Sequence, residues 1–179
     1  KYEKLKKSFS KPYHPSILYN VGEAYFRESM LGKSQKAFDD FLVDYSHLRV
    51  APFARLRIAL IYDLTDKPAH EILVLYKNAI DRSPHPKARY EAKLRYVGFR
   101  VSRNKKVSQT DLETLVFLEQ SPDESKILDE NLKKLLWLVR LRSLIVQKKY
   151  KNALSYVSTI PYDLLKLNER KVFEGDAAE

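Results

Sequence analysis

A glycine interrupts the first strongly helical pattern of this chain. The run LYNVGEAYF places Leu18, Val21 and Tyr25 at helical spacing, yet Gly22 lies in the middle of it. A glycine inside a helix costs about 1 kcal/mol relative to alanine, and the chain has only four glycines in 179 residues. We therefore expect a second helix to cross so close to Gly22 that no side chain fits there.

The pattern around this glycine recurs along the chain. Ala59, Gly98 and Leu141 follow it at successive intervals of 37, 39 and 43 residues. A second helical pattern comes after each of them, at steps of 12, 16 and 19 residues, or of 13, 17 and 20 after Ala59. The residues at these steps are Ser34, Phe38 and Phe41; Ile72, Tyr76 and Ala79; Thr110, Thr114 and Phe117; and Ala153, Val157 and Ile160. The spacing predicts four helix–turn–helix repeats, with one extra turn residue in the second. Gly22 and Gly98 are each expected where the two helices of their repeat cross.

Composition favours an all-α fold, because Gly and Pro are scarce and Leu, Lys, Glu and Arg fill long stretches. Helices are predicted over 15–29, 34–45, 51–65, 69–82, 87–103, 109–120, 124–147, 150–159 and 162–173. The repeats are expected over 15–50, 51–86, 87–123 and 124–161, with flanking helices at 1–11 and 162–173. We thus expect one domain over residues 1–179 that is a segment of a longer repeat array, since single repeats cannot bury their apolar faces alone.

These spacings resemble the tetratricopeptide repeat, in which a large residue precedes a small one by four positions and an aromatic residue follows it by three. The residues that carry the resemblance are Gly22, Tyr25, Ala59, Tyr62, Gly98, Trp137 and Ala153. Two positions depart from it, because Arg55 stands where a large apolar residue is expected and Leu141 where a small one is expected. The resemblance implies a right-handed superhelical solenoid of antiparallel helix pairs, whose first helices line a concave groove.

One stretch, FLVDYSHLRVAPFARLRIALIY, is similar to repeats of bacterial envelope proteins of the outer-membrane assembly and cell-division coordinator type. That similarity implies a periplasmic location and a part in assembling an envelope complex. A cytoplasmic location stays open, because a chain without cysteine is tolerated in a reducing or an oxidising compartment.

The sequence offers no pattern for catalysis. It has no cysteine, and His14, His47, His70 and His85 lie in or beside predicted turns without the spacing of metal ligands. Phosphate-binding glycine loops and nucleophile elbows are also missing. No apolar run approaches the roughly 18 residues of a membrane span. We predict a protein that is not an enzyme and that uses no metal, cofactor or catalytic residue.

The resemblance assigns the partner-binding groove to exposed positions of the first helices. These are Tyr19, Glu23 and Phe26; Leu56, Leu60 and Asp63; Arg95, Phe99 and Ser102; and Leu138, Arg142 and Ile145. Aromatic and arginine side chains concentrate binding energy at interfaces, so Tyr19, Phe26, Arg95 and Phe99 are expected to contribute most. The expected partner is a peptide or helix of another protein. The alternative is that these residues pack within the chain's own superhelix.

Two other functions remain open at this stage. The formal net charge is +10, and basic residues concentrate at 82–106 and 133–151. This permits binding to nucleic acid, anionic lipid or an acidic protein surface, and the alternative is a solvated helix face. Tyr90, Tyr96 and Phe99 alternate there with arginines, as base stacking would need. The chain could also be a structural spacer within a long solenoid. The sequence leaves the oligomeric state and the identity of the partner open.

Overall fold

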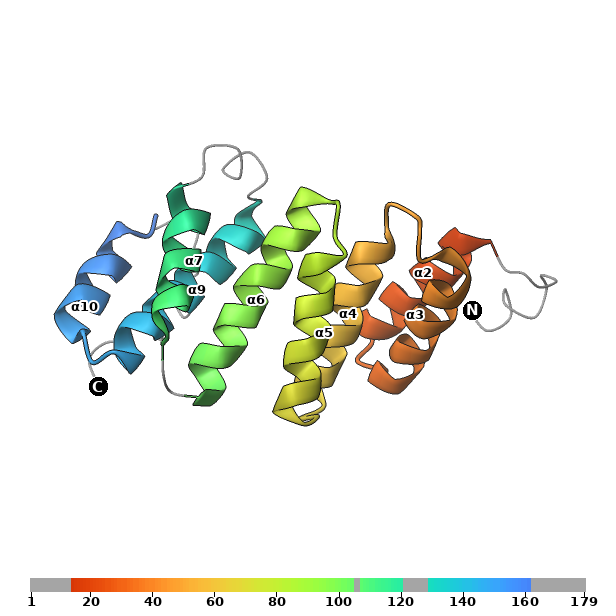
Figure 1. The fold of residues 1–179 in the computed structure, drawn as a ribbon, viewed down its shortest axis with the longest axis horizontal. Coiled ribbons are helices and arrows are strands. Elements are labelled where there is room, and N and C mark those ends of the chain that lie inside the picture. Colours follow the sequence, from red (N-terminus) through yellow and green to blue (C-terminus); the bar gives the residue numbers. More distant parts are fainter. Residues whose placement is uncertain (1–13, 105–106, 121–128, 162–179) are drawn as a thin grey trace. The chain divides into compact units, whose positions relative to one another are not determined.

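The computed structural model describes residues 14–104, 107–120 and 129–161, and in these ranges every regular element is a helix (Figure 1). The helices are α2 (Pro15–Arg27), α3 (Leu31–Tyr45), α4 (Ala51–Leu64), α5 (Ala69–Asp81), α6 (Pro86–Asn104), α7 (Gln109–Gln120), α9 (Glu130–Val146) and α10 (Tyr150–Thr159). The all-α prediction is confirmed. The chain divides into two compact parts, residues 1–89 and 90–179, here called the N-terminal and C-terminal halves.

Most helices begin and end within two residues of their predicted bounds, and two do not. α3 begins at Leu31 rather than 34, so that Ser34 lies inside the helix. α9 begins at Glu130, because Asp129 has an extended backbone and its carboxylate accepts a hydrogen bond from the Leu132 N–H at 2.9 Å. The predicted start of that helix at 124 and the flanking helices at 1–11 and 162–173 lie outside the described residues. No helix of the described ranges is long and apolar enough to cross a membrane.

The same tight turn joins the two helices of three pairs. Its central residues, Ser29, Asp66 and Lys148, have positive φ angles of 57°, 50° and 59°. The next residue in each turn donates its N–H to the carbonyl five positions earlier. These bonds run from Met30 to Tyr25 (2.9 Å), from Lys67 to Tyr62 (3.1 Å) and from Lys149 to Leu144 (3.0 Å). They satisfy carbonyls at the helix end. Each turn residue lies seven positions after the residue that begins its repeat, so the backbone repeats with the sequence.

Gly22 lies where α2 and α3 cross. A Cβ placed on it would lie 2.7 Å from Cε1 of Phe38, a ring that is fully buried. The Ser34 hydroxyl donates to the Gly22 carbonyl at 2.9 Å, also in the interior. The expected close approach at this glycine is therefore confirmed: the missing side chain leaves room for an aromatic ring.

The core of the N-terminal half extends from this crossing through α4 to α5. Phe38 and Phe41 of α3 pack with small and branched residues of α4, which are Ala51, Ala54, Ile58 and Ile61. On α5 the three predicted core positions, Ile72, Tyr76 and Ala79, are all buried. The extra turn residue predicted for this repeat is also present, because α5 begins ten residues after Ala59 whereas α3 begins nine after Gly22.

In the C-terminal half, the predicted face of α7 is wrong by one residue. The buried residues are Asp111, Leu115 and Leu118, whereas the sequence steps predicted the residues just before each of them, Thr110, Thr114 and Phe117. Phe117 is 55% exposed. The steps after Gly98 are therefore 13, 17 and 20, the same as in the second repeat.

A capping interaction stabilises the start of α7, which lies at the predicted residue 109. The Ser108 N–H donates to the Asp111 carboxylate at 3.0 Å, and the Asp111 N–H donates to the Ser108 hydroxyl at 3.1 Å. This reciprocal arrangement satisfies backbone groups at the first turn. The Asp111 side chain, only 2% exposed, also accepts from Arg100 of α6 at 2.9 Å, which compensates its buried charge.

Gly98 makes a close contact with a helix other than the expected one. A Cβ on Gly98 would lie 2.9 Å from Cγ2 of Val139, on α9. The expectation that both glycines lie between the two helices of one repeat is thus correct for Gly22 and wrong for Gly98. The contact instead brings together α6 and α9, the first helices of successive repeats. Leu94, Val97 and Val101 of α6 complete that core with Leu132 and Leu136 of α9.

Tyr156 of α10 lies against acidic Glu119 of α7. Its hydroxyl donates to the Glu119 carboxylate at 3.2 Å, and Arg140 of α9 lies 3.7 Å from the same carboxylate. Burial and the negative charge of Glu119 raise the pKa of Tyr156 above its ordinary value of 10.0.

We predict that Gly22→Ala lowers the free energy of unfolding by about 1–3 kcal/mol, because the new methyl group clashes with a ring in a packed core. Gly32→Ala is the matched control, since no atom lies within 4 Å of its added Cβ. That change should be neutral or stabilise by up to about 1 kcal/mol through helix propensity. Urea denaturation measures both. Equal stabilisation by the two alanines would contradict the close approach at Gly22.

A second prediction concerns alkaline pH. Because the pKa of Tyr156 is raised in the folded state, the unfolded chain loses this proton first, and stability falls as pH rises above about 10. Tyr156→Phe should remove part of that loss, up to about 1 kcal/mol near pH 11 after allowing for solvent screening. Near pH 7 the variant should match or fall slightly below the wild type. Parallel curves of stability against pH for the two proteins would contradict the raised pKa of Tyr156.

Candidate partner-binding surface

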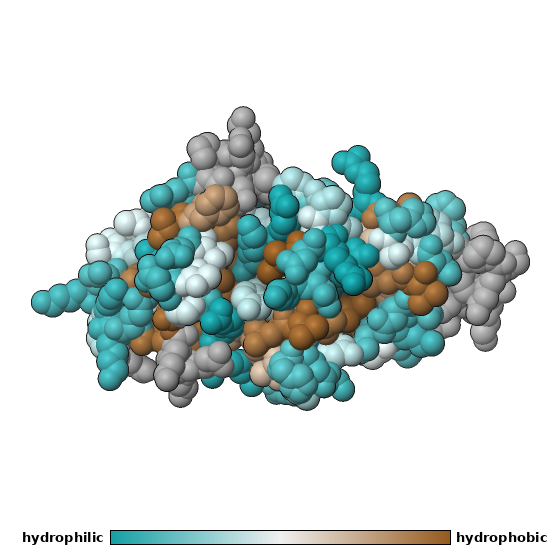
Figure 2. Space-filling model, in the orientation of Figure 1, coloured by the Kyte–Doolittle hydropathy of each residue, from teal (hydrophilic) through white to brown (hydrophobic). Residues whose placement is uncertain are grey.

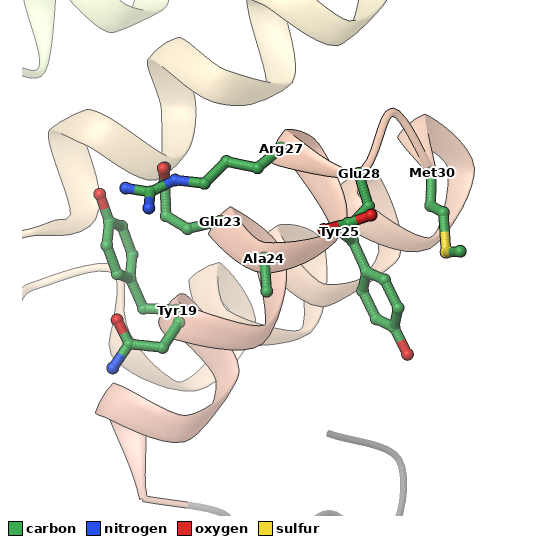
Figure 3. A pocket seen from close by; sticks show the side chains of 8 residues that line it. Tyr19, Glu23, Ala24, Tyr25, Arg27, Glu28 and Met30 are labelled. Atoms are coloured by element: carbon green, nitrogen blue, oxygen red, sulfur yellow. The ribbon is translucent and has the colours of Figure 1, made fainter. Parts of the chain in front are cut away.

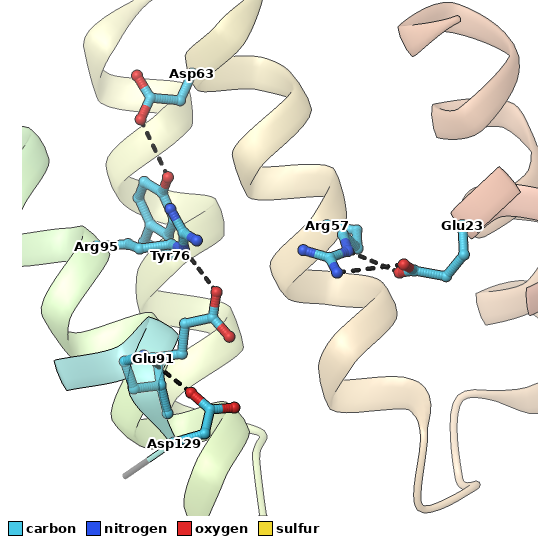
Figure 4. Close-up of polar contacts among 8 residues, drawn as sticks. Glu23, Arg57, Asp63, Tyr76, Glu91, Arg95 and Asp129 are labelled. Carbon is cyan, nitrogen blue, oxygen red and sulfur yellow. Dashed lines mark hydrogen bonds and ion pairs between the residues drawn. The ribbon is translucent and has the colours of Figure 1, made fainter. Parts of the chain in front are cut away.

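In the N-terminal half, the predicted groove residues Glu23 and Phe26 of α2 both contact Arg57 of α4, which was not among the predicted residues. Figure 4 shows the pair of Arg57 and Glu23. Arg57 of α4 donates from Nε to Glu23 Oε1 at 2.7 Å and from Nη2 to Oε2 at 3.2 Å. Its guanidinium carbon lies 4.8 Å from the ring centre of Phe26. This two-bond pair links α2 to α4 and holds an arginine against an aromatic face, where its orientation is fixed.

Tyr19, the remaining predicted residue of α2, packs inward with its ring. The ring contacts Phe38 and Phe41 edge-on, with centroids 5.7 and 5.8 Å apart. A hollow of about 870 Å³ lies along α2 (Figure 3). It is lined by Tyr19, Asn20, Glu23, Ala24, Tyr25, Arg27, Glu28 and Met30. Its lining mixes acidic, basic and aromatic groups, so it favours no single kind of ligand.

Three of the predicted groove residues are buried. Leu56 is 2% exposed, and Leu60 and Phe99 are each 6% exposed. Asp63 is half-buried, and its carboxylate accepts from the hydroxyl of Tyr76 at 3.1 Å (Figure 4). The predicted residues that a partner could reach are the half-buried or exposed ones, which are Tyr19, Glu23, Phe26, Asp63, Arg95, Ser102, Leu138, Arg142 and Ile145.

In the C-terminal half, the predicted groove residues lie on α6 and α9, and these two helices are in contact. Arg142 of α9 is exposed and donates from Nη1 to the Ser102 hydroxyl of α6 at 3.2 Å. Arg95 is held by Glu91 one turn earlier, with Nε 2.8 Å from the carboxylate. Leu138 is half-buried one turn before Arg142. The hydrogen bond from Arg142 to Ser102 therefore orders the polar edge of a surface that α6 and α9 share.

Charge is distributed unequally between first and second helices. Between residues 90 and 146, α6 and α9 carry eight Lys or Arg and two Asp or Glu. In the same half, α7 and α10 carry one Lys and three acids. In the N-terminal half, α3 and α5 carry five acids and three bases, while α2 and α4 carry two acids and three bases. Positive charge is thus concentrated on the first helices, most strongly on α6 and α9.

Exposed apolar side chains are spread over several helices and form patches between hydrophilic ones on the face in Figure 2. The most exposed are Val43, Leu64, Val74 and Phe117. Phe117 of α7 lies under Lys93 of α6, 5.4 Å from the ring centre to the ammonium nitrogen. Within the residues that the structure describes, no group of three or more His, Asp or Glu is placed to hold a metal ion.

No protein-family model, no curated protein and no solved structure matches this chain. Its function must therefore be argued from the surface itself.

The contact between α2 and α4 gives a third prediction, tested by a double-mutant cycle of Glu23→Gln and Arg57→Gln. Because this pair is half-buried, bidentate and stacked on Phe26, its coupling energy should be about 1–2 kcal/mol. The exposed pair Lys36–Asp40, at 3.7 Å, is the control and should give no more than about 0.5 kcal/mol. Coupling at Glu23–Arg57 no larger than in this control would show that the pair does not join the helices.

Proposed function

We propose that the chain is a non-enzymatic scaffold that binds a peptide or helix of another protein. The binding residues lie on the first helices of the repeats, which are α2, α4, α6 and α9. The observation that carries the proposal is the Arg57–Glu23–Phe26 cluster, in which an aromatic ring and a guanidinium are held in fixed positions on a half-exposed surface. Side chains that are already ordered lose little entropy on binding. Aromatic residues and arginine are also the types that concentrate binding energy.

The proposal includes a tetratricopeptide-like arrangement of the helix pairs in a right-handed solenoid. Its support is the turn that recurs at Ser29, Asp66 and Lys148, together with the buried steps shared by the repeats. A location in the bacterial envelope, and a part in assembling a complex there, rest on the similarity of residues 41–62 alone.

Nucleic-acid binding has less support, because several arginines of the basic stretches already face acids. Arg95 pairs with Glu91, Arg100 with Asp111, and Arg140 lies 3.7 Å from Glu119. Each such pair leaves less positive charge for a phosphate backbone, which supplies most non-specific affinity. No specific observation favours the alternative that the chain is a structural spacer within a long solenoid.

The fourth prediction compares two phenylalanines that each lie beneath a cation. Phe26→Ala removes the ring under Arg57 on a first helix, and Phe117→Ala removes the ring under Lys93 on a second helix. We expect chemical crosslinking in extract of the source cells to join a specific protein to the wild type and to Phe117→Ala. The yield with Phe26→Ala should fall about tenfold, as for loss of an interface anchor.

Circular dichroism must show equal helicity of the three proteins for this comparison to hold. Equal crosslinking by all three would move binding away from the first helices. No specific crosslinked protein with any of them would favour the spacer alternative.

A further inference from the structure

We infer that the partner segment is acidic, and that α6 and α9 of the C-terminal half recognise it. The inference rests on the proposed function and names the chemistry of its partner. Its basis is the positive charge of these two helices between residues 90 and 146, where eight bases stand against two acids. Arg100 and Arg140 face Asp111 and Glu119 of α7, which leaves an excess of four. Packing of the core does not need this excess, because Leu94, Val97, Leu136 and Val139 already hold α6 against α9.

Arg142 is the cation best placed to receive a carboxylate. Its side chain is exposed, and its hydrogen-bond partner among the described residues is the uncharged hydroxyl of Ser102. That bond orients the guanidinium without neutralising it. The remaining N–H groups are therefore available for a charge-assisted pair with a carboxylate, the geometry in which arginine binds strongly.

Neighbouring residues extend the site along α6. The guanidinium of Arg103 lies over the ring of Phe99, 5.8 Å from its centre, so a buried aromatic ring supports a second cation. Arg95, one turn before Phe99, is fixed by Glu91 at 2.8 Å. The charge of Arg95 is thus met within α6, and the cation that α6 adds to Arg142 of α9 is Arg103.

An apolar contact accompanies the charges. Leu138 is half-buried one helical turn before Arg142, and it gives the surface a place for an aliphatic or aromatic side chain. The occupant that fits is therefore an amphipathic segment with several Asp or Glu residues beside at least one large apolar residue. Helices of this kind dock through apolar anchors, while charges set orientation and partner choice.

The test uses three synthetic helical peptides of about 16 residues that share the same leucines and carry Glu, Gln or Lys at all other surface positions. Binding to the full chain is measured by fluorescence anisotropy at about 50 mM and about 300 mM NaCl. We expect the Glu peptide to bind at least about tenfold more tightly than the Gln peptide at low salt, and the Lys peptide not to bind.

Matched variants locate the site. Arg142→Glu should weaken binding of the Glu peptide about tenfold or more, whereas Arg142→Lys should retain most of it. Lys151→Glu makes the same change of charge at an exposed position of α10 and should leave binding unchanged. If Arg142→Glu and Lys151→Glu weaken binding of the Glu peptide equally, the overall charge alone decides binding, and the proposed site on α6 and α9 is wrong.

The remaining outcomes separate this inference from the proposed function. Equal binding of the Glu and Gln peptides would overturn acidic recognition and leave the scaffold function standing. A single-stranded oligonucleotide that displaces the Glu peptide at equal concentration would overturn the inference in favour of general polyanion binding. If no peptide binds, the inference fails, and the crosslinking comparison of Phe26→Ala with Phe117→Ala decides the proposed function independently.

Discussion

The contact between Gly22 and the ring of Phe38 sets how closely α2 and α3 approach, and the rest of the N-terminal half is built around it. Because no side chain extends from Gly22, the ring fills the space and lies fully buried. Tyr19 and Phe41 pack against each other beside it, and α4 closes the core with small residues such as Ala51 and Ala54. Only a glycine removes the 2.7 Å clash, so its cost in helix propensity is offset by the packing that it permits.

The turns between paired helices have positive φ angles that packing imposes, rather than the preferences of the turn residues themselves. Ser29, Asp66 and Lys148 adopt left-handed backbone conformations that glycine would enter more easily. A non-glycine residue there is held against a penalty of about 1 kcal/mol. In each case the turn follows a helix whose apolar face is already buried, and its N–H groups satisfy the last carbonyls. The sequence carries little local signal for these turns because the tertiary contacts position them.

What the sequence could predict was set by how local each interaction is. Helix positions and the buried steps of the first, second and fourth repeats follow from periodicity, which is a property of neighbouring residues. The bounds of α7 were predicted, but its buried face was missed by one position, because the steps after Gly98 are 13, 17 and 20 rather than the 12, 16 and 19 of the first repeat. The contact of Gly98 with Val139, and the pairing of Glu23 with Arg57, join residues 41 and 34 positions apart, and no local pattern encodes them.

The same limit applies to the candidate surface. Repeat spacing indicates which residues share a side of a helix, but it does not reveal which of them a neighbouring helix covers, and Leu56, Leu60 and Phe99 are buried. The residues left accessible are mainly charged and aromatic. A helical core requires apolar faces and tolerates charges of either sign on the outside. Of the eight bases on α6 and α9, Arg100 and Arg140 face acids of α7. The positive charge that remains in excess is not a requirement of folding, and like charges on adjacent helices oppose it. Binding of an acidic partner would remove that repulsion, and so accounts for a feature that the fold alone does not explain.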